Sequence, residues 1–115
     1  MDKQFETLAM ASEYLDKLIP GIEGVIPDIR DFRLDKCGNT LADIFDGLQW
    51  ICEALTLTKE AQKEEIDSTE IDGFVEEMLE GFQDEDYILM ADLFEYEILP
   101  ILKKWNTSIK ASVSC

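Results

Sequence analysis

Residues 87–105 most limit what this chain can fold into. At 100° per residue, seven apolar side chains fill one side of a helix: Tyr87, Ala91, Phe94, Ile98, Ile101, Leu102 and Trp105. Five more fill much of the other side: Leu89, Leu93, Tyr96, Leu99 and Pro100. A helix that is apolar nearly all round must be covered on more than one face. Because the chain has only 115 residues and a net charge of −16, we expect self-association or a bound partner to supply part of that cover.

The length predicts one domain with a single core. Hydrophobic residues make up 46% of the chain, which is ordinary for a globular protein, so the acidity does not indicate disorder. The first residues lack the basic and apolar regions of a signal peptide, and the longest apolar run, residues 87–91, is too short to cross a bilayer. We therefore expect a cytoplasmic protein that does not enter a membrane.

An apolar register repeats every seven residues on both sides of Pro20 and Pro27: Leu8, Leu15, Ile22 and Ile29. Two unrelated helices would have no reason to share one register. We therefore predict a single long helix, bent at the prolines, that ends at about Leu34. The competing interpretation ends the first helix at Ile19 and begins a second one with Pro20 at its first position.

Three further helices are expected after a turn at residues 35–39. The second carries a core stripe from Leu41 to Leu55, and residues 58–66 either extend it or form a loop. A capping box at residues 67–70 opens the third, and an acidic connection leads to the fourth. Short connections favour antiparallel neighbours. The predicted fold is all-α, an up-down bundle of four helices over residues 1–106, with residues 107–115 as a flexible tail.

No residue pattern predicts a cofactor or a metal site. The chain has no histidine, which removes Ser-His-Asp and Cys-His catalysis and most zinc enzymes. Its three cysteines are odd in number and have no C-x-x-C spacing, so neither a disulfide framework nor a zinc site is indicated. We expect a non-enzymatic protein without catalytic residues.

The one enzymatic pattern is Glu76-Glu77-Met78-Leu79-Glu80. It resembles the Glu-Glu-x-x-Glu half of the motif of MazG-type all-helical nucleotide pyrophosphohydrolases. In those enzymes clustered carboxylates hold magnesium against a triphosphate. The next helix offers Asp92 and Glu95, with the two residue types exchanged relative to that motif. Because the glutamates lie opposite the core stripe, we keep a magnesium-dependent pyrophosphohydrolase only as an alternative.

Most of the negative charge lies in residues 58–86, which hold 12 acidic residues against Lys59 and Lys63. Such a field repels nucleic acid and anionic membranes and favours a basic partner. The outer side of the third helix carries an acidic face: Glu70, Asp72, Glu76, Glu77 and Glu80. A second hypothesis is therefore an inhibitor that presents this face to a basic target, in the manner of a nucleic-acid mimic.

Apolar side chains outside the core stripes are the candidate partner-binding residues: Trp50, Leu57, Leu89, Tyr96 and Leu99. Trp50 is either an interface anchor or is covered by the bend of the first helix or by residues 58–66. Our main hypothesis is an adaptor or chaperone-like protein–protein interaction module. We expect it to be a homodimer, with a basic or amphipathic-helix protein as a further partner.

One resemblance to known proteins lies in residues 86–100, Asp-Tyr-Ile-Leu-Met-Ala-Asp-Leu-Phe-Glu-Tyr-Glu-Ile-Leu-Pro. This stretch is similar to one found in small, uncharacterised helical proteins of bacteria. The resemblance implies a helical domain and a bacterial source, and it carries no activity across.

Overall fold

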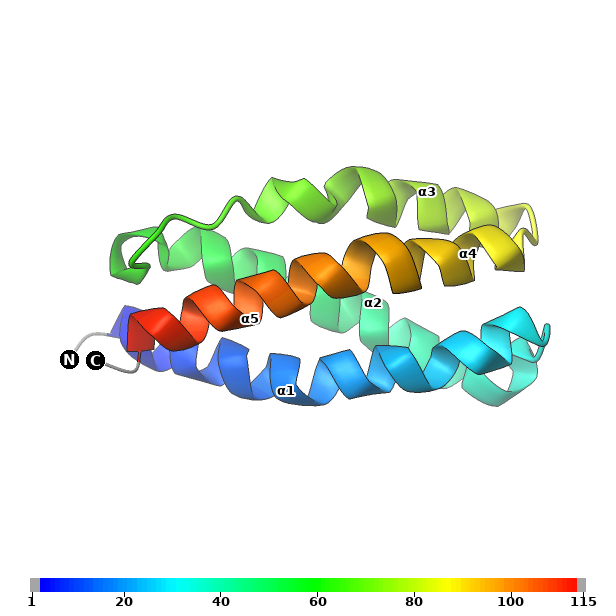
Figure 1. Ribbon diagram of the computed structural model, residues 1–115, viewed down its shortest axis with the longest axis horizontal. Helices are drawn as coiled ribbons and strands as arrows, with labels where there is room; N and C mark the ends of the chain where they lie inside the picture. Colours follow the sequence, from blue (N-terminus) through cyan, green and yellow to red (C-terminus); the bar gives the residue numbers. More distant parts are fainter. Residues whose placement is uncertain (1–2, 114–115) are drawn as a thin grey trace.

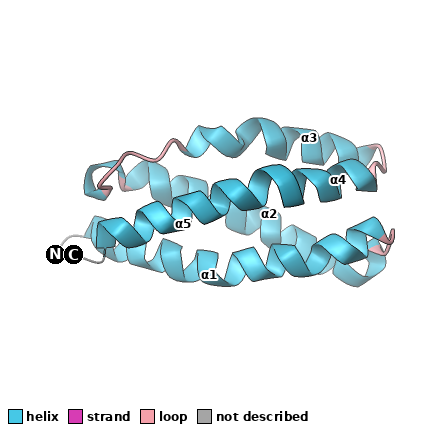
Figure 2. Ribbon diagram, viewed as in Figure 1, coloured by secondary structure: helices cyan, strands magenta, loops and turns pink. Residues whose placement is uncertain are grey.

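The computed structural model describes residues 3–113, which contain helices and no strand. The α-helices are α1 (Lys3–Arg30), α2 (Leu34–Leu57), α3 (Asp72–Gln83), α4 (Tyr87–Leu93) and α5 (Leu99–Val113). The shorter elements are 3₁₀ turns at Lys59–Ala61 and Ser68–Ile71 and a π-helical turn at Phe94–Ile98. α4, the π turn and α5 follow one another without a loop and form one long helix (Figure 1). The predicted all-α bundle of four helices is confirmed, and loops are confined to its ends and to the segment before α3 (Figure 2).

α1 runs unbroken through Pro20 and Pro27, as the shared apolar register predicts. A proline within a helix leaves the carbonyl four residues earlier without an amide partner. Those carbonyls belong to Asp16 and Glu23, which are exposed, as both prolines are. Water can therefore satisfy them, and α1 bows gently with its convex side outward (Figure 1).

The long fourth helix is covered on both sides within the chain. It packs against α1 over α4 and α5, and against α3 over α4. Side chains from both of its apolar sides are buried, namely Leu93, Phe94, Ile98, Leu99 and Trp105. A partner is therefore not needed to cover these residues.

The π-helical turn has a local cause in Pro100. Proline has no N–H, so residue 100 cannot make the regular hydrogen bond to the carbonyl of Tyr96. Just before it, the N–H of Leu99 bonds to the carbonyl of Phe94, five residues earlier. Turns of this kind occur mostly as single π-bulges inside α-helices. The apolar residues after it, Ile101, Leu102 and Trp105, are still buried on the side that a uniform 100° wheel predicts.

The turn between α1 and α2 lies at residues 31–33. The N–H of Arg33 bonds to the carbonyl of Asp28 at 2.8 Å, and the N–H of Phe32 bonds to that of Ile29 at 3.0 Å. This pair of bonds is the Schellman pattern that ends many helices. Phe32 takes the left-handed position of the motif, with φ at 60°, which glycine usually occupies.

The predicted turn at residues 35–39 is therefore wrong. That prediction followed Gly38 and Asn39, both of which lie inside α2. The buried stripe of α2 continues back from Leu41 to Cys37, and burying it outweighs the cost of about 1 kcal/mol for a glycine in a helix.

Residues 107–113 are helical, so the predicted flexible tail is wrong over this range. Residues 114–115 of that tail lie outside the described residues. Ile109 is fully buried, and Ser112 Oγ accepts a hydrogen bond of 2.9 Å from the N–H of Lys63. The apolar register of α5 continues to its end because α5 also supports the loop that precedes α3.

Residues 58–66, for which helix and loop were both open, form a 3₁₀ turn and a loop. Gln62 holds the loop from inside. Its Nε2 donates to the carbonyl of Leu55 at 2.8 Å, and its Oε1 accepts from the N–H of Ile66 at 2.8 Å. The loop is thereby fastened to the end of α2, and this sets where α3 begins.

Candidate interaction surface

α2 and α3 do not pack against each other along their lengths. α2 lies against α1, and it touches the 3₁₀ turn Ser68–Ile71 that leads into α3. Away from this contact α2 lies along α1, while α3 lies beside α4 (Figure 1). The two helices leave an open groove between them.

The groove consists of two adjoining hollows with volumes of about 400 and 460 Å³. Both hollows are lined by Gln49, Cys52 and Asp72, so we treat them as one surface, the α2–α3 groove. The other lining residues of the first hollow are Phe45, Leu48, Ile71, Val75, Glu76 and Leu79. Those of the second are Glu53, Thr56, Leu57, Ser68 and Thr69.

Apolar side chains make up the bottom and much of the walls of the groove. Leu48 and Ile71 are buried beneath it. Leu57 is 73% exposed and Leu79 is 46% exposed, while Val75 is half-buried. Removing such apolar surface from water is favourable by roughly 25 cal/mol per Å². The groove therefore offers a partner binding energy that the bundle itself does not use.

Cys52 lies at the centre of the groove. Its Sγ donates to the carbonyl of Ser68 at 3.7 Å. Burial, together with the negative charges of Asp72 and Glu53, raises the pKa of the thiol to about 11. The thiol is protonated at neutral pH, whereas nucleophilic and metal-binding cysteines are thiolates. Cys52 therefore packs in the groove as a small apolar side chain.

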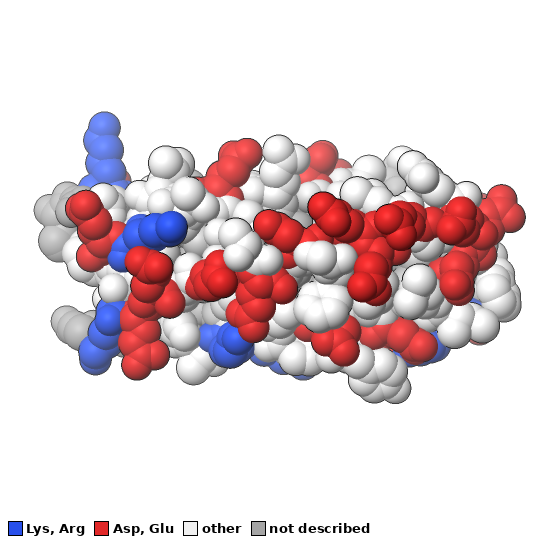
Figure 3. Space-filling model, turned by 90° about the horizontal axis from the view of Figure 1, so that it is seen from above, with Lys and Arg blue, Asp and Glu red and all other residues white. Residues whose placement is uncertain are grey.

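Acidic side chains edge the groove on both sides. Glu53 comes from α2, and Asp72 and Glu76 come from α3; all three are exposed. Among the described residues, no lysine or arginine lines either hollow. Figure 3 looks onto the side of the molecule that carries α3 and shows a band of Asp and Glu with uncharged side chains between them.

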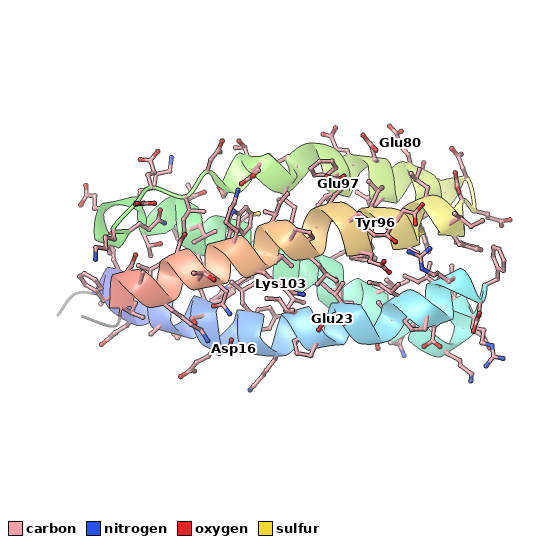
Figure 4. The ribbon with its side chains drawn as sticks, viewed as in Figure 1. Asp16, Glu23, Glu80, Tyr96, Glu97 and Lys103 are labelled. Carbon is pink, nitrogen blue, oxygen red and sulfur yellow. The ribbon has the colours of Figure 1, made fainter. Side chains whose placement is uncertain are left out.

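The predicted acidic face divides into residues with different surroundings. Asp72 and Glu76 line the groove, whereas Glu77 and Glu80 do not. Glu80 projects from the outer edge of α3 (Figure 4). Glu70 forms an ion pair of 2.6 Å with Lys104 of α5. Only part of the predicted face is therefore free to meet a partner at the groove.

Four of the five predicted partner-binding residues reach the surface in some degree. Leu57 lines the groove, Leu89 is 36% exposed, and Tyr96 is exposed on the outer side of the fourth helix (Figure 4). Leu99 is 5% exposed, so its assignment to a partner surface is wrong. Leu99 faces α1, beside Ile26 and Pro27, and this contact buries it.

Trp50 is half-buried, and α1 covers part of it. The ring of Tyr14 meets it edge-on, with 5.6 Å between the ring centroids and 70° between the planes. Both rings and Met10 line a hollow of about 440 Å³ between α1 and α2, which shares no residue with the α2–α3 groove. Cover by the first helix was one of the alternatives for Trp50.

The carboxylates proposed for a magnesium site are not gathered in one place. Arg30 Nη1 lies 3.0 Å from Asp92 Oδ1, and Arg30 Nη2 lies 3.2 Å from Glu95 Oε1. Hydrogen bonds from Tyr96 and then Arg30 lower the pKa of Glu95. Within residues 3–113, no group of three or more potential metal ligands lies close enough together to hold an ion. The resemblance to pyrophosphohydrolases therefore does not extend to a metal cluster in this part of the chain.

Comparison with known proteins shows the family of this chain. Residues 6–108 match a protein family described as a domain of unknown function (DUF8042). The chain belongs to this family. No curated protein and no solved structure matches it. The expected resemblance to proteins without an assigned function is confirmed, and membership of DUF8042 brings no activity with it.

The DUF8042 bundle also has surface features that the sequence reasoning missed. Phe45 lies on the apolar stripe of α2, and Val75 and Leu79 lie on that of α3, yet all three line the groove. The sequence does indicate the exposure of Leu79, because this residue lies at the edge of the apolar stripe of α3, beside Asp72 and Glu76. At such an edge an apolar side chain is covered only if a neighbouring helix is close.

None of the helices described here is long and apolar enough to span a membrane.

Proposed function

We propose that this DUF8042 protein is a non-enzymatic protein–protein interaction module, an adaptor or chaperone-like protein, whose working surface is the α2–α3 groove. One observation carries the proposal. The bundle buries most of the apolar side chains of its fourth helix, such as Phe94, Ile98 and Trp105, yet it leaves Leu57, Val75 and Leu79 at an open groove. Exposed apolar surface of this kind is typical of binding sites.

The chemistry of the described residues supports a binding role rather than catalysis. The raised pKa of the Cys52 thiol leaves no thiolate for nucleophilic attack. Asp92 and Glu95 are paired with Arg30, so they are not free oxygen ligands. The thiols of Cys37 and Cys52 are free, which fits the reducing environment of the cytoplasm.

A second candidate function is inhibition of a basic target by the acidic side of α3. The band of carboxylates in Figure 3 favours it. Against it, Glu70 is already paired with Lys104, and the half-exposed Leu79 and Phe82 interrupt the band. A nucleic-acid mimic needs charge alone, whereas this surface combines charge with apolar side chains. We therefore favour the interaction module.

We also propose self-association, through a surface other than the apolar faces of residues 87–105 from which the sequence predicted it. Large apolar side chains are exposed around the two turns at one end of the bundle, namely Phe32, Phe82, Ile88 and Leu89. The bundle measures 22 × 19 Å across, so an end-to-end contact would bury roughly 400 Å² per partner. Stable interfaces bury about 800 Å² per partner. We therefore propose a weak dimer formed through this end.

The groove is tested by capturing partners from the native cell with wild-type protein and two variants. Leu79→Glu places a charge in the groove at a half-exposed site. Met10→Glu is the matched control, because Met10 is 56% exposed and lies on the α1–α2 side. We expect the same proteins to be retained by wild type and Met10→Glu and lost with Leu79→Glu. Retention of every partner by Leu79→Glu would contradict the assignment of the groove.

A further inference from the structure

The charge at the α2–α3 groove differs from that at every other hollow we describe on this molecule. The hollow beside Trp50 is lined by Lys17 together with acidic residues. Two further hollows, one at Glu23 and Glu95 and one at Glu70, are lined by Lys103 and by Lys104 respectively. The groove is lined by acidic residues and by no basic one among the described residues. A partner that fits it must therefore carry positive charge.

The three acidic residues at the groove are also free to pair with a partner. Within residues 3–113, none of Glu53, Asp72 and Glu76 lies within 4.0 Å of a lysine or arginine nitrogen. Glu53 accepts only a long hydrogen bond of 3.4 Å from Gln49. In contrast, the acidic residues Asp16, Glu23, Glu70, Asp92 and Glu95 all have basic partners. Three unpaired carboxylates thus lie beside the open apolar surface of the groove.

The shape of the groove indicates a helix. It runs between two helices, and the ridge of a third helix packs well into a furrow of this kind. Along α2 the lining extends from Phe45 to Leu57, a rise of about 18 Å at 1.5 Å per residue. Residues 3–113 contain no strand, so no sheet edge is offered to an extended peptide. A helix of about three turns matches this length.

We propose that the groove binds an amphipathic helix of another protein, about three turns long, whose apolar stripe is flanked by lysine or arginine. The apolar stripe contacts Val75, Leu79 and Leu57. The flanking cations meet Glu53 on one side and Asp72 and Glu76 on the other. A second copy of this chain does not suit the groove, because its net charge of −16 would be repelled by the same carboxylates. This inference rests on the proposed function and specifies the partner's chemistry.

Three labelled helical peptides of about 14 residues test the proposal by fluorescence anisotropy, with the full chain as the receptor. The first has leucines at i, i+4, i+7 and i+11 and lysines beside them. The second replaces the lysines by glutamates, and the third keeps the lysines but replaces the leucines by serines. We expect the first peptide to bind at least about tenfold more tightly than either of the others at low salt. The preference for lysine should shrink near 1 M salt, where the screening length falls to about 3 Å.

Charge-reversal variants separate the groove from the overall negative charge. Asp72→Lys/Glu76→Lys should invert the preference, so that the glutamate peptide binds more tightly. Glu6→Lys/Glu13→Lys changes the net charge equally on α1, away from the groove, and should leave the preference for lysine unchanged. Amide shifts in NMR spectra should change most at Cys52, Val75 and Leu79 when the first peptide is added.

Three results would overturn the inference: equal binding of the lysine and glutamate peptides, equal effects of the two double variants, or amide shifts confined to another surface. Failure of every peptide to bind would also overturn it. Such a failure does not decide the proposed function, since partner capture by wild type and Leu79→Glu tests the groove without assuming what chemistry its partner has.

Discussion

The ring of Tyr14 lies directly over Gly47, so closely that a Cβ built on Gly47 would be 2.8 Å from Tyr14 Cε2 and 2.9 Å from Cζ. The missing side chain lets α1 approach α2 and lets Tyr14 meet Trp50 edge-on. In Gly47→Ala the ring must tilt away. We expect the overpacking cost of about 1–3 kcal/mol to exceed the roughly 1 kcal/mol gained in helix propensity, for a net loss near 1 kcal/mol in urea denaturation.

Gly24 provides the matched control for that change. It is an exposed residue of α1, and nothing lies within 4 Å of a Cβ built there. Gly24→Ala should therefore stabilise the protein by about 0.5–1 kcal/mol. If Gly47→Ala were as stabilising as Gly24→Ala, Tyr14 would be free to move, and its contact with Gly47 would not matter to stability.

A second change relieves strain at the turn between α3 and α4. The N–H of Asp86 bonds to the carbonyl of Gly81 at 2.7 Å, and Glu85 takes the left-handed position with φ at 59°. This conformation costs residues with a side chain about 1–2 kcal/mol, whereas glycine adopts it freely. We expect Glu85→Gly to raise the free energy of unfolding by about 0.5–1 kcal/mol once the extra flexibility of glycine is counted.

Glu85→Gln separates strain from charge at the same position, because it removes the carboxylate and keeps the side chain. Its effect should stay within about 0.5 kcal/mol, as for most surface substitutions. An equal gain from both variants would assign the effect to the negative charge of residues 58–86 and not to the backbone.

The end of α1 and the burial of Leu99 depend on features that short-range sequence rules do not contain. The sequence placed the end of α1 too late, at about Leu34, because Phe32 occupies the left-handed position that glycine usually takes. Leu99 was assigned to a partner surface, but it faces Ile26 and Pro27 of α1, and this long-range contact buries it. By contrast, the unbroken α1 was predictable, since the register on both sides of Pro20 and Pro27 records one continuous buried face.

The groove was less accessible to sequence reasoning than the bundle. Leu79 and Val75 were recognisable as apolar members of α3, but their exposure depends on the divergence of α2 from α3. That divergence follows from long-range packing, in which α2 lies along α1 while α3 lies along α4. Asp72 and Glu76 were predicted as part of an acidic face, because a run of charge on one side of a helix needs no tertiary information; Glu53 of α2 was not part of that prediction.

The final turns of α5 provide a third test, at a place where the sequence favoured a tail. Ile109 is fully buried against the rest of the bundle. Ile109→Ala should lower the free energy of unfolding by about 2–5 kcal/mol, the range for large-to-small changes in a core. Thr107→Ala, at an exposed position two residues earlier, should change it by less than about 0.5 kcal/mol. Equal, small effects would mean that residues 107–113 do not pack as described.

A fourth prediction concerns pH and the polar contacts between α1 and α5. Ser12 Oγ donates to Asn106 Oδ1, and Asn106 Nδ2 donates to Asp16 Oδ1, both at 2.9 Å. Hydrogen bonds from Asn106 and Lys110 lower the pKa of Asp16 below its ordinary value of 3.8. The stability that Asp16 contributes is thus fully present above that ordinary value and is lost as the pH falls through the lowered one.

Asp16→Asn removes this titration. The difference in unfolding free energy between wild type and Asp16→Asn should be constant from about pH 7 to 5 and should shrink below about pH 4. Urea denaturation at several pH values measures it. A difference that stays constant down to pH 3 would show that the ionised form of Asp16 is not favoured by folding.

The last prediction concerns self-association through the end that carries Phe32. This end carries the cations Arg33, in the α1–α2 turn, and Lys36, in the first turn of α2, beside Asp31 and Asp35; it also carries Asp84 and Glu85 in the α3–α4 turn. A two-fold axis would bring Arg33 and Lys36 of one copy onto Asp84 and Glu85 of the other. Because the contact is small, we expect light scattering to give the 13.2 kDa chain mass at low micromolar concentration and to rise toward twice that value only when the protein is concentrated. Arg33→Glu should abolish the rise, and Arg33→Glu combined with Glu85→Arg should restore it. Unchanged masses in Arg33→Glu, or no recovery in the double variant, would exclude this arrangement.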